Sequence, residues 1–221
     1  MIPPQQSGAF VAAMEQVLDV YKRPYDELYP VVNMDESPKQ LIGETQIPLP
    51  AKPGKDRRHD YEYVRNGVCN VFLACEALRG KRYVKVTERK TKQDWAVFIK
   101  EIAEIHYPKA KRITMVMDNL ATHTPAALYE VYPPEQAKQI WDRFEFIYTP
   151  KHGSWLNIAE IELNVLMNQC LGRRIANIEV VQREVRVWQN ERNNKECKVN
   201  WRFQNENARV KLKSLYPKLY A

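Results

Sequence analysis

Glycine is scarce in this 221-residue chain. Only 7 residues are glycine, and no two of them form a G-x-G pair or a Walker-type loop, so Gly-rich nucleotide-binding loops are excluded. The 4 cysteines and 4 histidines show no C-x-x-C or H-x-x-x-H spacing, which argues against a zinc site and for buried free thiols. Apolar runs long enough for a membrane span and a signal peptide are also lacking. We therefore expect a cytoplasmic protein with no membrane partner.

The charge is unevenly distributed along the chain. The sequence holds 34 Lys and Arg against 27 Asp and Glu, a net charge of +7. Residues 1–172 hold 22 side chains of each sign, whereas residues 173–221 hold 12 basic and 5 acidic ones and so carry the whole excess. A segregated basic segment is typical of proteins that bind nucleic acid. A solvated helix face accounts for the same charge equally well, so charge alone leaves both interpretations open.

Hydrophobic periodicity predicts an α/β domain with a mixed five-stranded sheet flanked by helices, in the order β-β-β-α-β-α-β-α. Residues 29–38 are interpreted as a short strand that Pro38 ends, and residues 44–66 as an irregular excursion closed by Asn66-Gly67. A hairpin with its turn at Arg79-Gly80 follows. The remaining predicted elements are helices at 7–22, 91–105, 154–171 and from Asn177, a helical region around Pro133-Pro134, and strands at 112–119 and 144–150.

These elements predict one domain over residues 1–221. Its core spans about residues 28–172. A helix precedes that core, and a basic helical extension covers residues 173–221.

Three acids stand out against this pattern. Two predicted strands end in NMDE and VMDN, which brings Asp35 and Asp118 to the carboxyl ends where open sheets collect functional groups. The third is Glu160, on a largely apolar helix whose polar residues form one narrow stripe; Glu162 lies off that stripe. A lone acid at a strand end is usually a turn former, and a polar stripe can equally face water or satisfy an asparagine network. The stripe comprises Asn157, Glu160, Asn164 and Asn168.

Three carboxylates at one sheet edge suit Mg²⁺ or Mn²⁺, hard cations that prefer oxygen ligands. Two such ions, about 3.5–4 Å apart, stabilise the attacking and leaving oxygens of a phosphodiester displacement. Together with the basic segment, the acids predict phosphoryl transfer on nucleic acid.

The segments VVNMDES, MVMDNLATH and TPKHGSWLNIAEIE resemble, in order and spacing, the catalytic core of DDE transposases of bacterial insertion sequences, in the branch related to Tc/mariner elements. The resemblance implies an RNase H-like fold and a catalytic, metal-binding triad of Asp35, Asp118 and Glu160. It also implies that metal-activated water cuts DNA at transposon ends, and that the freed 3′-hydroxyl then attacks target DNA.

Other residues are assigned around the triad. Glu36 is expected to point to the other side of its strand in a structural role, and Asn119 to orient a metal ligand or water. His123 either contacts the scissile phosphate or orders its loop, and Asn157 matches the lead-in to Glu160. Contacts to the DNA backbone are expected from Lys151, His152, Arg173, Arg174, Arg183, Arg186, Lys211 and Lys213.

The resemblance also sets expectations for the whole protein. Family members carry an N-terminal helix-turn-helix region, and we expect it to be absent because the first triad acid is already at position 35. A split element, a degenerate copy and an expressed fragment are all compatible with that expectation. The expected partners are double-stranded DNA, as transposon ends and target, and a second copy in a homodimer on the bacterial nucleoid. The alternative function is a catalytically inactive DNA-binding or dimerising remnant.

Overall fold

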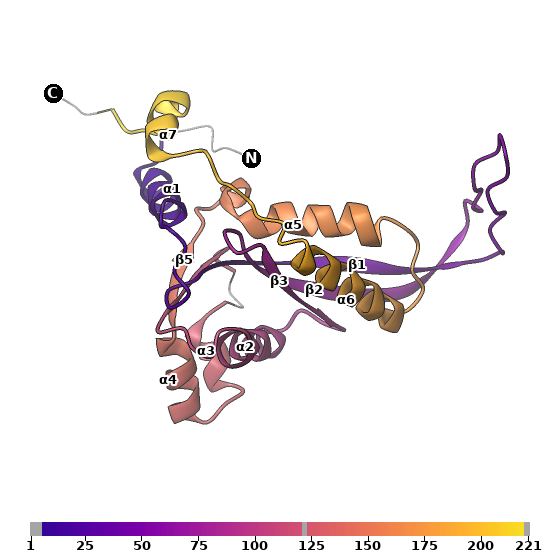
Figure 1. Ribbon diagram of the computed structural model, residues 1–221, viewed down its shortest axis with the longest axis horizontal. Helices are drawn as coiled ribbons and strands as arrows, with labels where there is room; N and C mark the ends of the chain where they lie inside the picture. Colours follow the sequence, from indigo (N-terminus) through magenta and orange to yellow (C-terminus); the bar gives the residue numbers. More distant parts are fainter. Residues whose placement is uncertain (1–5, 121–122, 219–221) are drawn as a thin grey trace.

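The computed structural model describes residues 6–120 and 123–218, which form a five-stranded mixed sheet with helices on both faces (Figure 1). β1 is antiparallel to β2 and parallel to β4; β2 and β3 are antiparallel, and β4 and β5 are parallel. The predicted fold class is therefore confirmed. The strands are β1 (Val31–Glu44), β2 (Tyr63–Glu76), β3 (Lys81–Thr87), β4 (Ile113–Met117) and β5 (Phe144–Tyr148), in the sheet order β3-β2-β1-β4-β5.

Seven α-helices lie within the described ranges, some of them continued by short 3₁₀ or π turns. The helices are α1 (Gly8–Tyr21), α2 (Lys92–Glu101), α3 (Pro125–Tyr129), α4 (Pro134–Asp142), α5 (Ile158–Leu166), α6 (Ile178–Asn194) and α7 (Asn205–Lys211). The short turns are Ile102–His106, Ser154–Leu156, Met167–Leu171 and Lys213–Leu215. No helix in these ranges is both long enough and apolar enough to cross a membrane.

The helices divide the core into three clusters. α2, α3 and α4 pack on one face of the sheet, where Trp95 is fully buried. α5 and α6 pack on the opposite face around Leu163 and Val185. α1 and α7 lie together at one end of the molecule (Figure 1), over Val116 and Ile147. The basic segment that starts at residue 173 therefore contributes α6 and α7 to the core.

Three helices begin where the sequence predicted, each at a side chain that caps the helix. The Ser7 hydroxyl accepts from the backbone N–H of Phe10 at the start of α1. Thr91 and Asp94 form a capping box at the start of α2. Asn177 accepts from the N–H of Val180 at the start of α6. These side chains satisfy N–H groups that have no partner within the helix.

Pro38 does not end the first strand, contrary to the prediction. β1 continues to Glu44, and Pro38 stands opposite Asn70 of β2. The reason is that β4 pairs only with Val31–Asn33, so the rest of β1 has an unpaired edge on that side. A residue without an N–H is tolerated at such an edge.

Asn66-Gly67 also lies inside a strand instead of closing a loop. The register of β1 and β2 shifts between Gln40 and Ile42, so that Leu41 faces two residues of β2. Gly67 has a φ of 101° in this bulge, a conformation that favours glycine. The excursion itself spans residues 45–62 and projects from the body of the molecule (Figure 1).

Candidate active site

Asp35, Asp118 and Glu160 line one cavity of about 410 Å³ at the edge of the sheet. Asp35 lies two residues beyond the last β1 residue that pairs with β4, and Asp118 directly follows β4. Glu160 is in the first turn of α5. Three elements that are distant in the sequence thus bring the predicted acids to the same space. The other lining residues are Glu36, Ser37, Thr149, Ser154, Asn157, Leu163, Asn164 and Met167.

Asn157 connects α5 to the strand that carries Asp35. Its Oδ1 accepts from the N–H of Ala159, which caps the helix. Its Nδ2 donates to the carbonyl of Met34 at 2.9 Å and lies 3.3 Å from Oδ2 of Asp35. Because Asn157 is buried, these contacts fix the start of α5 against β1 and so place Glu160 beside Asp35.

The turn between β5 and α5 is tight. The N–H of Gly153 donates to the carbonyl of Pro150, and a Cβ atom at position 153 would lie 2.6 Å from Cγ of Pro150. His152, just before it, has a φ of 66°. Only glycine fits this turn without displacing Pro150, and the turn delivers Ser154 and Asn157 to the cavity.

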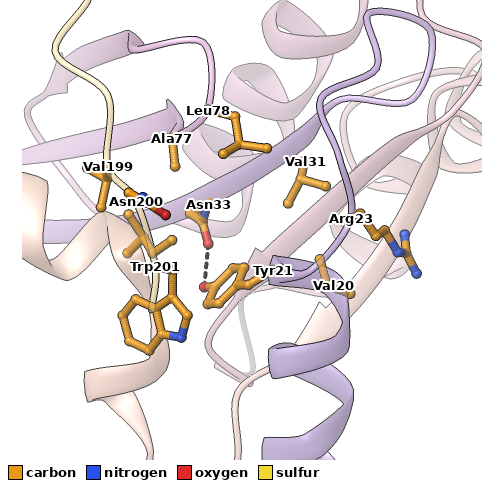
Figure 2. A pocket seen from close by; sticks show the side chains of 11 residues that line it. Val20, Tyr21, Arg23, Val31, Asn33, Ala77, Leu78, Val199, Asn200 and Trp201 are labelled. Carbon is orange, nitrogen blue, oxygen red and sulfur yellow. Dashed lines mark hydrogen bonds between the residues drawn. The ribbon is translucent and has the colours of Figure 1, made fainter. Parts of the chain in front are cut away.

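A second, smaller cavity is lined by residues that include Tyr21, Asn33 and Trp201 (Figure 2) and by Ile158 at the start of α5. The hydroxyl of Tyr21 is 2.6 Å from Oδ1 of Asn33 and 2.7 Å from the carbonyl of Leu156, which precedes Asn157. The ring of Trp201 packs 5.2 Å from that of Tyr21. At about 40 Å³ this cavity is too small for a nucleotide. The contact of Tyr21 with Leu156 at its wall holds the segment that leads into α5.

The acids create an excess of negative charge. Burial raises the pKa of Asp35 to about 7, against the opposing hydrogen bond from the N–H of Glu36. The charges of Glu36, Asp118 and Glu160 act in the same direction as burial and contribute to this value. A cation bound beside Asp35 would favour the ionised carboxylate over the protonated carboxyl group.

The donor set suits a divalent metal ion. The candidate ligands Asp35, Asp118 and Glu160 present carboxylate oxygens, which Mg²⁺ and Mn²⁺ prefer. In the described part of the chain, no three His, Cys, Asp or Glu side chains lie close enough together to hold a metal ion by themselves. An open arrangement is compatible with Mg²⁺, which is usually bound through one or two carboxylates together with waters and substrate phosphates.

Glu36, although it lines the cavity, and Glu162 both pair with basic side chains. Glu36 is on the α2 side of β1, where burial raises its pKa but contacts with His123 and Lys90 outweigh burial and lower it overall. Burial lowers the pKa of His123, yet contacts with Asp118 and Glu36 raise it to about 9.

Glu162 is also buried, but it belongs to the core. Its carboxylate accepts two hydrogen bonds of 2.8 Å from Arg82 and lies 3.0 Å from Arg192. The polar stripe of the predicted helix therefore separated Glu160, which lines the cavity, from Glu162, which is buried in the core.

The predicted DNA contacts lie at separate places. Lys151 and His152 are exposed in the turn before α5, next to the cavity. Arg173 pairs with Glu184, and Arg174 with Glu44. The remaining predicted contacts are exposed: Arg183 and Arg186 on α6, and Lys211 and Lys213 at the α7 end. Asn119, which we expected to orient a metal ligand or water, is exposed after β4.

One residue of this region was missed by sequence reasoning. Lys90 lies in the connection between β3 and α2, and its Nζ is 3.0 Å from Oε1 of Glu36. It belongs to a segment, residues 88–92, in which four of the five residues are charged, and nothing in that segment distinguishes it from a solvated loop residue.

The mixed sheet, its strand order and its covering helices define an RNase H-like fold. A family model described as DDE superfamily endonuclease matches residues 30–182. The chain therefore belongs to the DDE superfamily endonuclease family, as its motifs predicted. No curated protein sequence matches this chain significantly.

Solved structures of the mariner transposase Mos1 share this fold, which confirms the predicted relationship to Tc/mariner elements at the level of the fold. The Mos1 mariner paired end complex with Mn matches with a TM-score of 0.62 and 15% identity over 99% of this chain and 65% of the Mos1 chain. The Mos1 transposase paired-end complex with left transposon end matches with a TM-score of 0.58 and 14% identity, over 89% of this chain and 60% of the Mos1 chain. The Mos1 Strand Transfer Complex matches with a TM-score of 0.57 and 14% identity, over 89% of this chain and 63% of the Mos1 chain. The chain thus spans less than two thirds of the length of these Mos1 chains.

Proposed function

We propose that this chain is the catalytic part of a DNA transposase. It hydrolyses phosphodiester bonds at transposon ends and then transfers the freed 3′-hydroxyl into target DNA. The observation that carries this proposal is the convergence of Asp35, Asp118 and Glu160 on one open cavity in a member of the DDE superfamily endonuclease family. An open, acid-lined cavity at the sheet edge can admit a DNA strand.

The chemistry follows from the charge of the cavity. When bound by Asp35, Asp118 and Glu160, Mg²⁺ or Mn²⁺, as two ions, would polarise the scissile phosphate and activate the nucleophile. Asn157 holds Asp35 in place through Nδ2. Cleavage and strand transfer are the same displacement with a different nucleophile, water in the first and a 3′-hydroxyl in the second, so one set of acids serves both. Mos1 structures with Mn and with Mg support the choice of metal.

The partners in this proposal are double-stranded transposon ends, target DNA and a second copy of the chain. Mos1 structures described as paired-end complexes support a homodimer that holds two ends together. We place the protein in the bacterial cytoplasm, on the nucleoid when bound to DNA. Phosphate contacts from Lys151 and His152, which adjoin the cavity, would hold the DNA next to the acids.

A nicking and strand-transfer assay tests this function. The substrate is a supercoiled plasmid that carries the DNA flanking this chain's own coding sequence, with Mg²⁺ or Mn²⁺ added. We expect nicked and joined products that require the metal and that disappear in Asp35→Ala, Asp118→Ala and Glu160→Ala. Asp142→Ala, at an exposed acid of α4 that pairs with Lys138, is the matched control and should keep activity.

The alternative, an inactive remnant, gives the opposite result. A well-folded protein that binds this DNA but yields no metal-dependent product would overturn the catalytic proposal. Products that persist in all three triad variants would assign the cleavage to a contaminant and overturn it as well.

A further inference from the structure

Three ion pairs connect the protein surface to Asp118. Nζ of Lys90 lies 3.0 Å from Oε1 of Glu36, and Oε2 of Glu36 lies 3.3 Å from Nε2 of His123. On the far side of the ring, Nδ1 of His123 lies 2.9 Å from Oδ1 of Asp118. The side chains of Glu36 and His123 are each only 1% exposed, whereas that of Lys90 is 43% exposed. The series therefore runs from solvent through the interior to the rim of the cavity.

The orientation of the His123 ring is fixed on several sides. The ring stacks on the indole of Trp95, with the centroids 5.5 Å apart and the planes 25° apart. The backbone carbonyl of His123 accepts a hydrogen bond from the hydroxyl of Tyr148. Each ring nitrogen faces a carboxylate oxygen, and only the cationic ring has an N–H for both. His123 is buried, its two ring nitrogens face carboxylates, and it is not among the residues that line the cavity, which favours the ordering role of the two that the sequence allowed.

The contact with His123 constrains one half of the Asp118 carboxylate. Oδ1 is buried beside the ring, yet the Asp118 side chain is 36% exposed, so its accessible surface lies on the rest of the side chain. The last torsion of an aspartate is broad and nearly two-fold, and a strand end alone would not select one orientation. The ion pair between Oδ1 and His123 favours one orientation, which leaves the other oxygen for the cavity.

We propose that Lys90, Glu36 and His123 are positioning residues that hold the Asp118 carboxylate in the orientation required for a divalent metal ion. This proposal rests on the proposed function, because it assumes that Asp118 is a metal ligand. Lys90 balances the charge of buried Glu36, Glu36 balances His123, and His123 orients Asp118. Residues that orient a metal ligand in this way typically contribute about 10-fold to 100-fold to metal affinity or activity.

Mn²⁺ affinity, measured by calorimetric titration of the full chain, tests the proposal without relying on activity. We expect Glu36→Gln, which keeps the shape of the side chain and removes its charge, to weaken Mn²⁺ binding about 10-fold to 100-fold. Lys90→Met should also weaken Mn²⁺ binding, whereas Lys90→Arg, which keeps the positive charge, should bind Mn²⁺ as the wild type does. Because Lys90 is partly exposed, these two variants will fold, and thermal unfolding verifies that each variant does.

Lys92→Met is the matched control. Lys92 is 45% exposed, lies two residues from Lys90, and pairs with Glu130 on α3's C-terminal side. We expect wild-type Mn²⁺ affinity in this variant. In the nicking assay, Lys90→Met should lower kcat and leave KM for DNA unchanged, whereas a lysine that contacts DNA would raise KM.

The outcomes separate this proposal from the proposed function. Wild-type Mn²⁺ affinity in both Glu36→Gln and Lys90→Met would overturn the positioning role, as would an effect of Lys90→Met on KM alone. If the wild type binds Mn²⁺ in an Asp118-dependent way but does not cut DNA, the proposed function fails and the affinities still decide the positioning role. If Asp118→Ala leaves Mn²⁺ binding unchanged, the positioning role is wrong whatever the protein does to DNA.

Discussion

At the scale of the residue, neighbouring acids in this protein have different roles because alternation and helical spacing send them to different surroundings. Asp35 faces Asn157 and the cavity, whereas Glu36, the next residue of the strand, pairs with His123 and Lys90. Glu160 faces the cavity, whereas Glu162, two positions along the helix, is buried against arginine. The side chain alone does not define its function; the element that carries it does.

Metal affinity should depend on pH through Asp35. Its pKa of about 7 means that the carboxyl is largely protonated at pH 6 and must lose that proton before it can bind a cation. We expect Mn²⁺ affinity to rise about 10-fold between pH 6 and pH 8, as calorimetric titration would show. Asp118→Asn should bind more weakly but keep the dependence, whereas Asp35→Asn should flatten it. A flat profile in the wild type would contradict the raised pKa.

Glu162 should contribute to stability and not to catalysis. Its side chain and that of Arg82 are almost fully buried, so Glu162→Ala leaves an arginine without its partner. We expect a loss of about 3–5 kcal/mol in the free energy of unfolding, measured with urea. Glu135→Ala, on the surface of α4, should stay within about 0.5 kcal/mol of wild type. A small effect of Glu162→Ala would mean that Arg82 finds another partner.

At the scale of the element, the start of α5 is the part that assembles the cavity. The turn at Gly153 sets the direction of the chain, and the contact of Tyr21 with Leu156 holds it from behind. Asn157 then caps the helix with one atom of its amide and contacts β1 with the other. A helix cap and a contact to a candidate metal ligand are combined in one side chain.

Asn157→Ser separates these two roles. Serine caps helices about as well as asparagine, so α5 should remain intact, but serine is too short to reach Asp35 and the Met34 carbonyl. We expect activity in the nicking assay to fall about 10-fold to 100-fold. The buried Met34 carbonyl loses its donor, which should cost about 1–3 kcal/mol of stability in urea unfolding.

The same substitution at another helix start is the control for this prediction. Asn177 caps α6 through Val180 and does not line the cavity. Asn177→Ser should therefore change neither activity nor stability by much. Equal losses in both variants would show that capping alone, and not the contact with β1, explains the effect at position 157.

At the scale of the whole molecule, the basic segment is part of the body of the domain. β3 is an edge strand, and side-chain amides of α6 cover its backbone: Oε1 of Gln189 accepts from the N–H of Val84, and Asn193 exchanges two hydrogen bonds with Arg82. Such cover removes an edge on which another chain could pair. The outer surface of α6 carries exposed arginines, so one helix serves both the core and a candidate DNA contact.

DNA affinity should depend on salt through that surface. If Arg183 and Arg186 each contact a phosphate, the double variant Arg183→Ala/Arg186→Ala should reduce the slope of log Kobs against log salt by about 2, measured by fluorescence anisotropy. The metal-dependent nicking of saturated DNA should persist. Lys138→Ala, on the helix layer at the opposite face of the sheet, should leave the slope unchanged. An unchanged slope in the double variant would place the phosphate contacts elsewhere.

Much of the fold was predictable because its signals are local. Alternation identified the strands, apolar periodicity identified the helices, and Ser7, Thr91 and Asn177 marked helix starts. Pro38 and Gly67 were misinterpreted for one shared reason: whether proline or glycine is tolerated inside a strand depends on which edge is paired and where the register shifts. That information belongs to the sheet and is absent from any short segment.

The candidate site, like the fold, was predictable from the sequence only where the signals are local. The sequence determined the motifs, the order of the strands along the chain, the separation of Glu160 from Glu162 and the location of the excess positive charge. Only the tertiary structure decided that Lys90 reaches Glu36, that His123 is buried between two carboxylates, and that burial raises the pKa of Asp35. The physical reason is range: propensity and periodicity act over a few residues, whereas desolvation and ion pairing depend on groups that meet only when distant segments pack together.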